Sequence, residues 1–345
     1  MAQLVVQTAF PGDLLLSIPL LKQIRIYFPG DPIVLLCRNG LGELFLKEKL
    51  ADEVIEVNKR DKRSSALALK RLQSQEWTRI FCPHESYRTA FWIRSLKARE
   101  FSVGFKKWWN FWAFSKRTQK PLHLPDALRQ LALLKAVHPE FAKVWQRDLD
   151  ETMTSNSRER KDIQLSGAIP DWAKMSLHAN QPQNKIFIAP GSVWPTKMWT
   201  KEGFRDLAKS LKAKGNKVIF VGSPGERDLC EEIALAAGAD SIAGKTTISE
   251  LIQNFSTGKV LISNDSGAMH SASVADLPTV AIFGPTVLEF GFRPWNEKTV
   301  VVQLDLKCRP CAIHGGQKCP LGTHACMRDL PFSQVEAAVS KLIVM

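Results

Sequence analysis

Three charged residues, Asp13, Lys197 and Asp265, each lie in a turn that follows a short apolar run. Such runs are typical of buried parallel strands. In open α/β sheets, ligands bind just beyond the carboxyl ends of the strands, which is where these turns are expected. A carboxylate in that place can act as a general base, and a lysine ammonium can bind a phosphate oxygen. The three residues therefore suggest a site for chemistry on an anionic ligand.

The stretch Lys259–Gly284 carries the strongest local signal. It contains an apolar run, a polar turn from Asn264 to Gly267, small residues at 268–275 and a second apolar run at 279–283. This order predicts a strand, a turn, a helix and a strand. The N–H groups and the positive dipole end at the helix start favour an anion, and Gly267 permits close approach of a phosphate. An ordinary crossover with a capped helix has the same residue types.

Two further side chains lie in turns of the same kind. Thr196 precedes Lys197 and offers a hydroxyl donor, and Glu226 can accept hydrogen bonds from a ribose diol. Simpler interpretations exist for each candidate. A turn lysine taken alone is usually an exposed surface residue, Glu226 suits the first turn of a helix, and Asp13 is a common N-cap type. The residue types alone do not decide between these interpretations.

The elements that must position these side chains alternate between strands and helices. Apolar runs predict strands at 4–7, 33–37, 54–57, 79–82, 186–189, 217–221, 259–263 and 279–283, and a short strand and turn are expected at 241–247. Helices are expected at 14–28 with a kink at Pro19, and at 40–50, 63–75, 87–96, 123–138, 201–214, 227–237, 249–253, 268–275 and 333–343. This alternation predicts an α/β protein with two parallel-sheet halves, a linker between 151 and 184, and a cleft where the halves face one another.

The net charge of +13 favours anionic partners such as nucleic acid, acidic lipid or phosphorylated small molecules. Much of that charge lies at 87–120, where Lys and Arg alternate with aromatic residues such as Trp108 and Trp109. The aromatics either belong to the core, or form an interfacial patch on acidic lipid. No nucleic-acid recognition motif is visible. Neither a membrane span nor a signal peptide is apparent, which favours a cytoplasmic protein with reduced thiols.

Four cysteines, Cys308, Cys311, Cys319 and Cys326, cluster near the C-terminus. One CxxC pair with two further cysteines is compatible with a tetrahedral zinc site. The spacings are irregular and no second CxxC is present, which favours reduced structural thiols and also leaves a redox pair or a disulfide open. The residue pattern leaves these alternatives undecided.

Several motifs together resemble glycosyltransferase family 9, the ADP-heptose:lipopolysaccharide heptosyltransferases of Gram-negative bacteria and their relatives. They are PGD at 11–13, PGSVWPTKMWTKEGFRDLA at 190–208, NDSGAMH at 264–270, and CRPC…CPLG…CM at 308–327. The last resembles the cysteine-rich tail of the heptosyltransferase II branch. The motifs occur in the family's order over nearly the whole chain. The turn AFPGD departs from the family, with Phe10 and Pro11 in unusual places, and the aromatic stretch at 106–117 is unusually dense.

The resemblance implies a glycosyltransferase B fold with two Rossmann-like domains. Residues 1–165 would form the acceptor-side domain, 166–332 the nucleotide-sugar-binding domain, and 333–345 a helix that packs back on the N-terminal domain. It also implies inverting transfer of heptose from ADP-heptose to the lipopolysaccharide inner core, with no cofactor and no catalytic metal. The implied catalytic residues are Asp13 as general base and Lys197. The implied nucleotide-sugar-binding residues are Thr196, Lys197, Glu226, Asp265, Ser266, Gly267 and His270.

The implied partners are an ADP-heptose-like donor and a lipid-anchored lipopolysaccharide core acceptor. The protein is expected to be a monomer in the cytoplasm that binds peripherally at the inner face of the inner membrane. Two alternatives remain open. The chain could be a related transferase that uses another nucleotide sugar or acceptor. It could also be a non-catalytic protein that binds anionic membranes or nucleic acid on the same scaffold, although the intact Asp13, Lys197 and Asp265 argue against this.

Overall fold

The computed structural model describes residues 1–154 and 169–344, which fall into two compact units. Residues 1–154 and 169–174 belong to the first unit, and residues 175–344 belong to the second. The predicted boundary between 165 and 166 lies outside the described residues. Residues 169–174 were expected in the C-terminal domain, but they join the first unit because the short helix η1 (Asp171–Ala173) packs on helix α2 and Trp172 contacts Phe141 edge to face.

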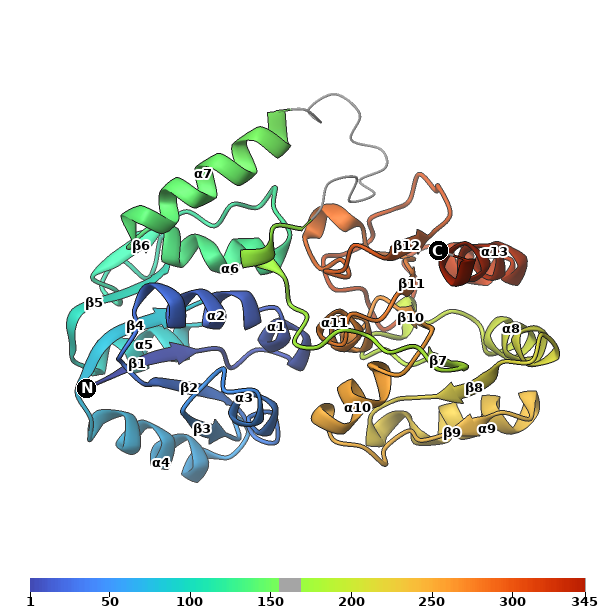
Figure 1. Cartoon of the computed structure of the whole chain (residues 1–345), viewed down its shortest axis with the longest axis horizontal. Coiled ribbons are helices and arrows are strands. Elements are labelled where there is room, and N and C mark those ends of the chain that lie inside the picture. Colours follow the sequence, from blue (N-terminus) through green and yellow to red (C-terminus); the bar gives the residue numbers. More distant parts are fainter. Residues whose placement is uncertain (155–168, 345) are drawn as a thin grey trace. The chain divides into compact units, whose positions relative to one another are not determined.

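The first unit is built on six parallel strands in the order β3-β2-β1-β4-β5-β6 (Figure 1). The strands are β1 (Ala2–Val6), β2 (Ile33–Arg38), β3 (Glu53–Val57), β4 (Trp77–Cys82), β5 (Ala98–Phe105) and β6 (Lys116–Thr118). The central strands are apolar runs buried along most of their length, as a parallel sheet covered on both faces requires. This is the strand order of a Rossmann-like domain, and it confirms the predicted fold class for this half.

Helices cover both faces of this sheet. They are α1 (Pro11–Leu15), α2 (Ile18–Tyr27), α3 (Glu43–Lys47), α4 (Lys62–Gln73), α5 (Tyr87–Ser95), α6 (Asp126–Lys135) and α7 (Pro139–Thr154). Ala68 and Leu72 of α4 and Ile93 of α5 share a core with Trp77 and the inward residues of the strands. The pair α2 and α6, which pack on each other, lies on the opposite side of the sheet from α4 (Figure 1).

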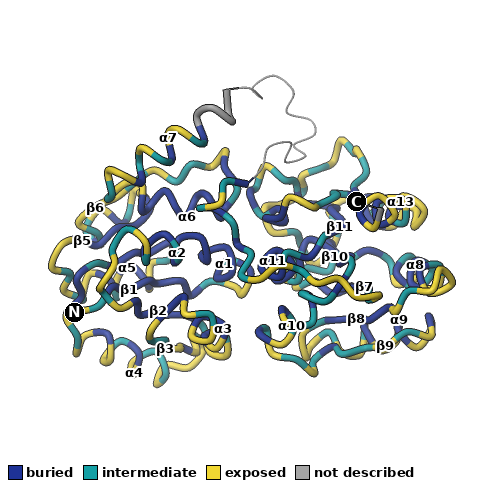
Figure 2. The backbone as a smooth tube through the Cα atoms, viewed as in Figure 1, coloured by how far each residue is buried: buried dark blue, intermediate teal, exposed yellow. Residues whose placement is uncertain are grey.

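The second unit repeats the same design. Its six parallel strands run in the order β12-β11-β10-β7-β8-β9. They are β7 (Lys185–Ala189), β8 (Lys217–Phe220), β9 (Asp240–Ser241), β10 (Val260–Asn264), β11 (Thr279–Ile282) and β12 (Thr299–Val302). Counted from β7, the order is again that of a Rossmann-like sheet. Figure 2 shows the central strands of both units buried, while the outer faces of α4 and α9 are partly exposed.

The α-helices of the second unit are α8 (Lys201–Ala213), α9 (Arg227–Ala237), α10 (Ile248–Phe255), α11 (Gly267–Val274), α12 (Ala325–Arg328) and α13 (Phe332–Val344). The short 3-10 turns are η2 (Pro195–Lys197), η3 (Pro224–Glu226) and η4 (Leu288–Phe290). One face of the sheet packs on α8, α9 and α13. On the other face, Met269 of α11 packs against Ala281 and Phe283.

Helix α13 corrects one expectation. Residues 333–345 were expected to pack back on the N-terminal domain. Instead Val335, Val339 and Leu342 lie in the core of the second unit, where α13 contacts α8 and strands β10 to β12. The apolar face of the helix is buried there, which stabilises it in place by roughly 1.5–3 kcal/mol for each fully buried side chain.

Other elements differ from the sequence expectations in simpler ways. The helix expected at 14–28 is two helices, and Pro19 lies at the start of α2, where a missing N–H costs no helical bond. Strands β5, β6 and β12 and helix α7 were not predicted. Charged residues lie at or near the start of β5 and β6, which hid their strand character. Among the described helices, none is long and apolar enough to cross a membrane.

Candidate functional site

The predicted site residues lie at the two topological switch points of the molecule. In the first unit, the strand order reverses between β1 and β4, and Asp13 follows β1. In the second unit it reverses between β7 and β10, and the segments after these strands carry Lys197 and Asp265. Open α/β sheets bind ligands at the carboxyl ends of the strands beside such a point. Each unit therefore presents one half-site, which is described by itself below.

Asp13 is the third residue of helix α1. Its Oδ2 accepts the N–H of Phe10 at 3.1 Å, so the side chain does part of the capping that its residue type suggested. The pKa of Asp13 is nevertheless raised from 3.8 to about 6, first by burial and second by the charge of Asp126. The Phe10 N–H and Lys120 offset only part of this. A carboxylate with a pKa near the working pH is suited to accept a proton.

Asp126 and its partners form a network that no sequence motif predicts. Lys120 Nζ lies 3.3 Å from Asp126 Oδ1 and 3.3 Å from Glu85 Oε1. Gln130 Nε2 donates to Asp126 Oδ2 at 2.9 Å and to the carbonyl of Asp13 at 3.1 Å. Glu85 follows β4, whereas Gln130 and Asp126 belong to α6. The backbone and the charge of Asp13 are thus controlled by residues far away in sequence, and no motif marks them.

A group of cations lies at the same end of the first sheet. Arg38 Nε donates to the carbonyl of Thr8, and Arg88 donates to the carbonyl of Lys59. Burial, followed by the charges of Arg38 and Arg88, lowers the pKa of Lys59 to about 8. Among the described residues, no carboxylate forms an ion pair with these three side chains. We call Arg38, Lys59 and Arg88 the cationic group. Its net positive charge is available to attract an anionic ligand.

His84 joins this group as a neutral ring. Burial, Lys59 and Arg38 lower its pKa to about 3. Its Nε2 lies 3.4 Å from Lys59 Nζ, and because the ammonium can only donate, this nitrogen must be the acceptor. The proton is then on Nδ1, which lies 2.8 Å from Thr89 Oγ1 and 3.1 Å from Thr8 Oγ1. His84 therefore orients Lys59 without adding charge, and sequence analysis had not singled it out.

In the second unit, Lys197 and Asp265 form a buried ion pair. Lys197 Nζ lies 2.6 Å from Asp265 Oδ2, and the hydroxyl of Thr286 donates to the same oxygen at 2.6 Å. The two turns lie side by side because β7 and β10 are neighbours in the sheet. The buried Asn264 links the same two turns, since it accepts from the N–H of Trp199 at 3.0 Å and donates to the carbonyl of Pro190 at 2.7 Å.

Thr196 lies beside this pair, but its hydroxyl is already engaged. The hydroxyl donates to the carbonyl of Gly316 at 2.9 Å and accepts the N–H of Gly316 at 2.8 Å. A hydroxyl has one proton to give. In this structure that proton is directed at Gly316, and the contact of Thr196 with a diphosphate stays a prediction.

Glu226 lies at the end of η3, next to the turn that follows β7. Its Oε2 accepts the N–H of Ser223 at 2.7 Å. The carboxylate passes so close to Gly191 that a Cβ on this glycine would lie 2.1 Å from Glu226 Oε1. Any side chain at 191 would therefore displace the Glu226 carboxylate, which is half-buried at the carboxyl edge of the sheet.

The start of α11 lies beside Asp265. Its N-cap residue, Ser266, makes no side-chain cap bond and instead has its hydroxyl 3.2 Å from Ser263 Oγ. Gly267 is exposed, and a Cβ added there would meet no atom within 4 Å. An anion can therefore approach the first-turn N–H groups. His270 is buried in the same helix, one turn further along.

The cysteines of the described residues form no disulfide. Cys308 is exposed, Cys311 and Cys319 are half-buried, and Cys326 is buried. In the described part of the chain, no three His, Cys, Asp or Glu side chains are grouped closely enough to hold a metal ion. The structure thus places the four cysteines as free thiols.

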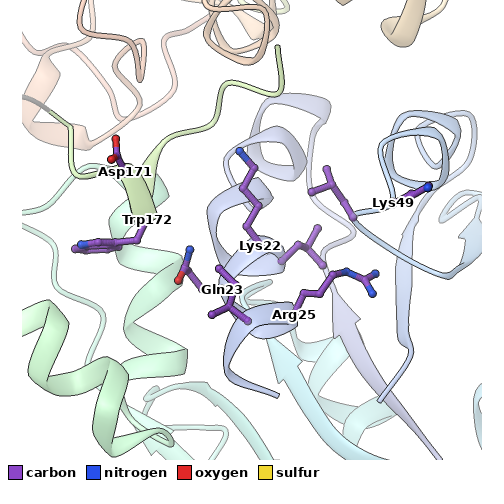
Figure 3. A pocket seen from close by; sticks show the side chains of 9 residues that line it. Lys22, Gln23, Arg25, Lys49, Asp171 and Trp172 are labelled. Atoms are coloured by element: carbon purple, nitrogen blue, oxygen red, sulfur yellow. The ribbon is translucent and has the colours of Figure 1, made fainter. Parts of the chain in front are cut away.

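A pocket of about 490 Å³ in the first unit lies away from the predicted residues. Lys22, Gln23 and Arg25 of α2 line it together with Asp171 and Trp172 of η1 (Figure 3). Burial lowers the pKa of Lys22. No residue at the carboxyl ends of β1 or β4 lines this pocket, so it is separate from the half-site around Asp13.

Comparison with known proteins identifies the family. The model of glycosyltransferase family 9 (heptosyltransferase) matches residues 66–319. The chain belongs to this family. The matched range includes Lys197, Glu226 and Asp265 and begins after Asp13.

The curated relatives are heptosyltransferases. The chain is 37% identical over 162 residues to lipooligosaccharide heptosyltransferase 2 of Campylobacter jejuni, which covers 45% of this chain and 50% of the relative. It is 30% identical over 138 residues to lipopolysaccharide heptosyltransferase 2 of Escherichia coli, covering 38% of this chain and 39% of the relative. The chain thus spans about half the length of the curated relatives it matches.

Solved structures show the fold over the whole chain. The E. coli ADP-heptose lps heptosyltransferase II superposes with a TM-score of 0.73 at 19% identity, covering 100% of this chain and 99% of that chain. A family 9 glycosyl transferase from Veillonella parvula gives 0.74 at 18% identity, covering 99% and 97%. The fold is therefore a glycosyltransferase B fold with two Rossmann-like domains, as predicted.

Proposed function

We propose that this protein is an inverting heptosyltransferase that moves a heptose from an ADP-heptose to the inner core of lipopolysaccharide. The observation that carries the proposal is the presence of complementary groups at the two switch points. One is a carboxylate with a raised pKa, and the other is a buried lysine beside a helix start that is open to anions. Membership of family 9 supports the same reaction class.

Asp13 is the proposed general base. In an inverting displacement, the acceptor hydroxyl attacks the anomeric carbon and the nucleoside diphosphate leaves from the opposite face. The base takes the hydroxyl proton as the new bond forms, and this role is typically worth 10²–10⁴ in rate. With a pKa of about 6, Asp13 is mostly ionised near pH 7, so it is ready to accept that proton.

Lys197 is the proposed electrostatic partner of the leaving diphosphate. Its ammonium is held at 2.6 Å by Asp265, which keeps a buried charge in place before the donor binds. As the bond to the sugar breaks, negative charge grows on the phosphate, and a preorganised cation stabilises it. In this proposal no catalytic metal takes that role and no cofactor is used.

The other donor contacts come from the same half-site. The N–H groups at the start of α11, next to Ser266 and Gly267, are offered to the phosphates. Glu226 accepts hydrogen bonds from the ribose. Asp265 holds Lys197, and the buried His270 supports the helix from within. Thr196 acts indirectly by holding the turn that carries Lys197, because its hydroxyl proton is already donated to the carbonyl of Gly316.

The cationic group, Arg38, Lys59 and Arg88, is proposed to receive the acid groups of the acceptor. It lies at the same sheet end as Asp13, and Asp13 is one of the charges that act on Lys59. A carboxylate or phosphate bound there would place a neighbouring sugar hydroxyl within reach of the base. The runner-up function is a family 9 transferase with another sugar or acceptor, which these same groups would also serve.

Transfer itself tests the proposal. The full-length chain is incubated with a panel of ADP-, UDP- and GDP-sugars and with heptose-deficient lipopolysaccharide, and products are identified by mass spectrometry. We expect one added heptose from ADP-heptose, with inversion at the anomeric carbon seen by NMR. Transfer from another donor alone would favour the runner-up. If no nucleotide diphosphate binds with defined stoichiometry, the chain is a non-catalytic binding protein.

We also propose that the protein works as a monomer in the cytoplasm, in peripheral contact with the inner membrane. The stretch at 87–120 divides into two parts. Phe101 and Phe105 are core residues of β5, whereas Trp108 is 87% exposed and Phe111 is 67% exposed. Trp109 stacks on Tyr87 at 4.0 Å. Exposed rings among Lys and Arg suit the head-group region of an anionic bilayer.

Vesicle sedimentation tests this contact. Replacing Trp108 and Phe111 with serine should weaken binding to phosphatidylglycerol vesicles about tenfold. Neutral phosphatidylcholine vesicles should bind little of the wild type and little of this variant. Leu235, which is 85% exposed on α9, gives the control Leu235→Ser, because it removes a similar apolar group outside the patch. Equal binding of all three proteins would contradict the proposed membrane surface.

A further inference from the structure

The cysteine-rich segment, residues 308–326, is tied to the turn that carries Lys197. Four hydrogen bonds connect this segment to Thr196. The Thr196 N–H and hydroxyl both donate to the carbonyl of Gly316, at 3.2 and 2.9 Å. The hydroxyl accepts the Gly316 N–H at 2.8 Å, and the Thr196 carbonyl lies 2.8 Å from His324 Nε2. Every polar group of Thr196 is therefore used by the segment.

The same segment also reaches the partner of Lys197. Arg309 donates to the carbonyl of Thr286 at 2.8 Å, and the Thr286 hydroxyl donates to Asp265 Oδ2 at 2.6 Å. The guanidinium further donates to the carbonyls of Gly284 and Leu304. Arg309 thereby fixes the chain that follows β11. The Lys197–Asp265 pair is held on both sides by one segment, through Thr196 on one side and Thr286 on the other.

His324 has an unusual backbone for this role. Its φ of +49° lies in the left-handed region, which is unfavourable for a residue with a Cβ and favours glycine. Because the Thr196 carbonyl can only accept, His324 Nε2 must be protonated and donate to it. Residues in such conformations persist where the surrounding structure requires them, and they often mark functional sites. A side chain is kept where glycine would fit the backbone better.

We infer that the cysteine-rich segment acts as a buttress for the donor half-site, with His324 and Arg309 as positioning residues for the Lys197–Asp265 pair. Neither residue has to touch the substrate. Their effect is to fix the turn 195–197 so that the lysine ammonium meets the diphosphate at the right place. This inference rests on the proposed function, because it assigns Lys197 to the leaving group. Small displacements of such a group lower rates strongly, by up to about 10²-fold per ångström.

Replacing His324 separates positioning from stability. His324→Gly removes the bond to Thr196 and also relieves the left-handed backbone. We therefore expect a melting temperature close to that of the wild type, with kcat lowered about 10- to 100-fold and the acceptor KM changed less than about threefold. His324→Gln keeps an N–H donor of similar reach and should recover most of kcat. His314→Ala, an exposed histidine in the same segment, is the matched control and should behave as wild type.

Amide hydrogen exchange gives a readout that needs no activity. The Thr196 N–H is protected by Gly316, so its exchange should become faster in His324→Gly and stay slow in His314→Ala. If the wild type transfers no sugar but the exchange changes as described, the proposed function fails and the buttress stands. If the wild type is active and His324→Gly keeps its kcat and its slow exchange, the buttress is refuted.

Discussion

Replacing Asp126 with asparagine should move the acidic limb of the activity profile to lower pH. Asp13 must be ionised to act as a base, so kcat/KM of the wild type should rise with pH through about 6, the pKa of this carboxyl, and then level off. The negative charge of Asp126 is the second largest cause of the raised pKa, after burial. Without that charge the ionised form of Asp13 is easier to reach, so the pKa of Asp13 falls.

The size and the sign of the shift follow from the neighbours. Removal of one nearby unit charge is worth on the order of 1 kcal/mol, or about 0.7 pH unit. Lys120 also lowers the pKa of Asp13, and Asp126 no longer neutralises it in the variant, so both changes act in one direction. Lys120→Met should move the limb the opposite way, to higher pH, because it removes a stabilising positive charge.

The assay is kcat/KM from initial rates between about pH 5 and 9, together with a carbon NMR titration of the Asp13 carboxyl. The reference variant is Asp13→Asn. Its kcat should be about 10²–10⁴-fold lower than that of the wild type, and its pH profile should show no acidic limb. If Asp126→Asn and Lys120→Met leave the limb in place or move it in the same direction, Asp126 and Lys120 do not set the pKa of Asp13 and their proposed role is refuted.

The same pKa predicts a stability effect of defined sign. Below pH 3.8 the carboxyl is neutral in the folded and unfolded protein alike, whereas above about 6 the folded protein must hold a charge on a half-buried carboxyl. The difference corresponds to about 3 kcal/mol of stability lost as pH rises through this window. Asp13→Asn avoids that loss. Its advantage in unfolding free energy over the wild type should grow by up to about 3 kcal/mol between about pH 4 and 8, and a constant advantage would contradict the burial of Asp13.

Three further predictions concern the other charges. Lys197→Met should lower kcat about 10²–10³-fold. It should also cost about 3–5 kcal/mol of stability in denaturant unfolding, because it leaves the buried Asp265 carboxylate unpaired. The control Lys201→Met breaks an exposed ion pair and should cost at most about 1 kcal/mol in the same measurement. Gly191→Ala places a methyl 2.1 Å from Glu226 Oε1, so it should weaken ADP binding about tenfold in calorimetry with little loss of stability. Lys59→Gln should raise the acceptor KM about tenfold. In the wild type this KM should increase as the pH rises above about 8, because Lys59 loses its proton there. An acceptor KM that does not change across this pH range would exclude Lys59 from the acceptor site.

The sequence by itself determined the two-part α/β fold and most of the strand ends. Short apolar runs followed by Gly, Pro and Asp are local signals, because burial of a parallel strand and termination of a helix depend on residues close together in the chain. Asp13, Lys197 and Asp265 were found this way. Strands β5 and β6 were missed because charged residues lie at or near their start.

The tertiary structure decided how these residues are used. Asp126 and Lys120 set the charge environment of Asp13 from elsewhere in the chain, and no residue type at 120 or 126 signals this. The hydroxyl of Thr196 was assigned to a ligand from its sequence position, but Gly316, far along the chain, takes its proton. The resemblance to family 9 implied that residues 333–345 pack on the N-terminal domain, whereas the apolar face of α13 packs in the core of the second unit. Hydrogen bonds and pKa values depend on which groups meet in space, and that is fixed by the folded chain rather than by local residue order.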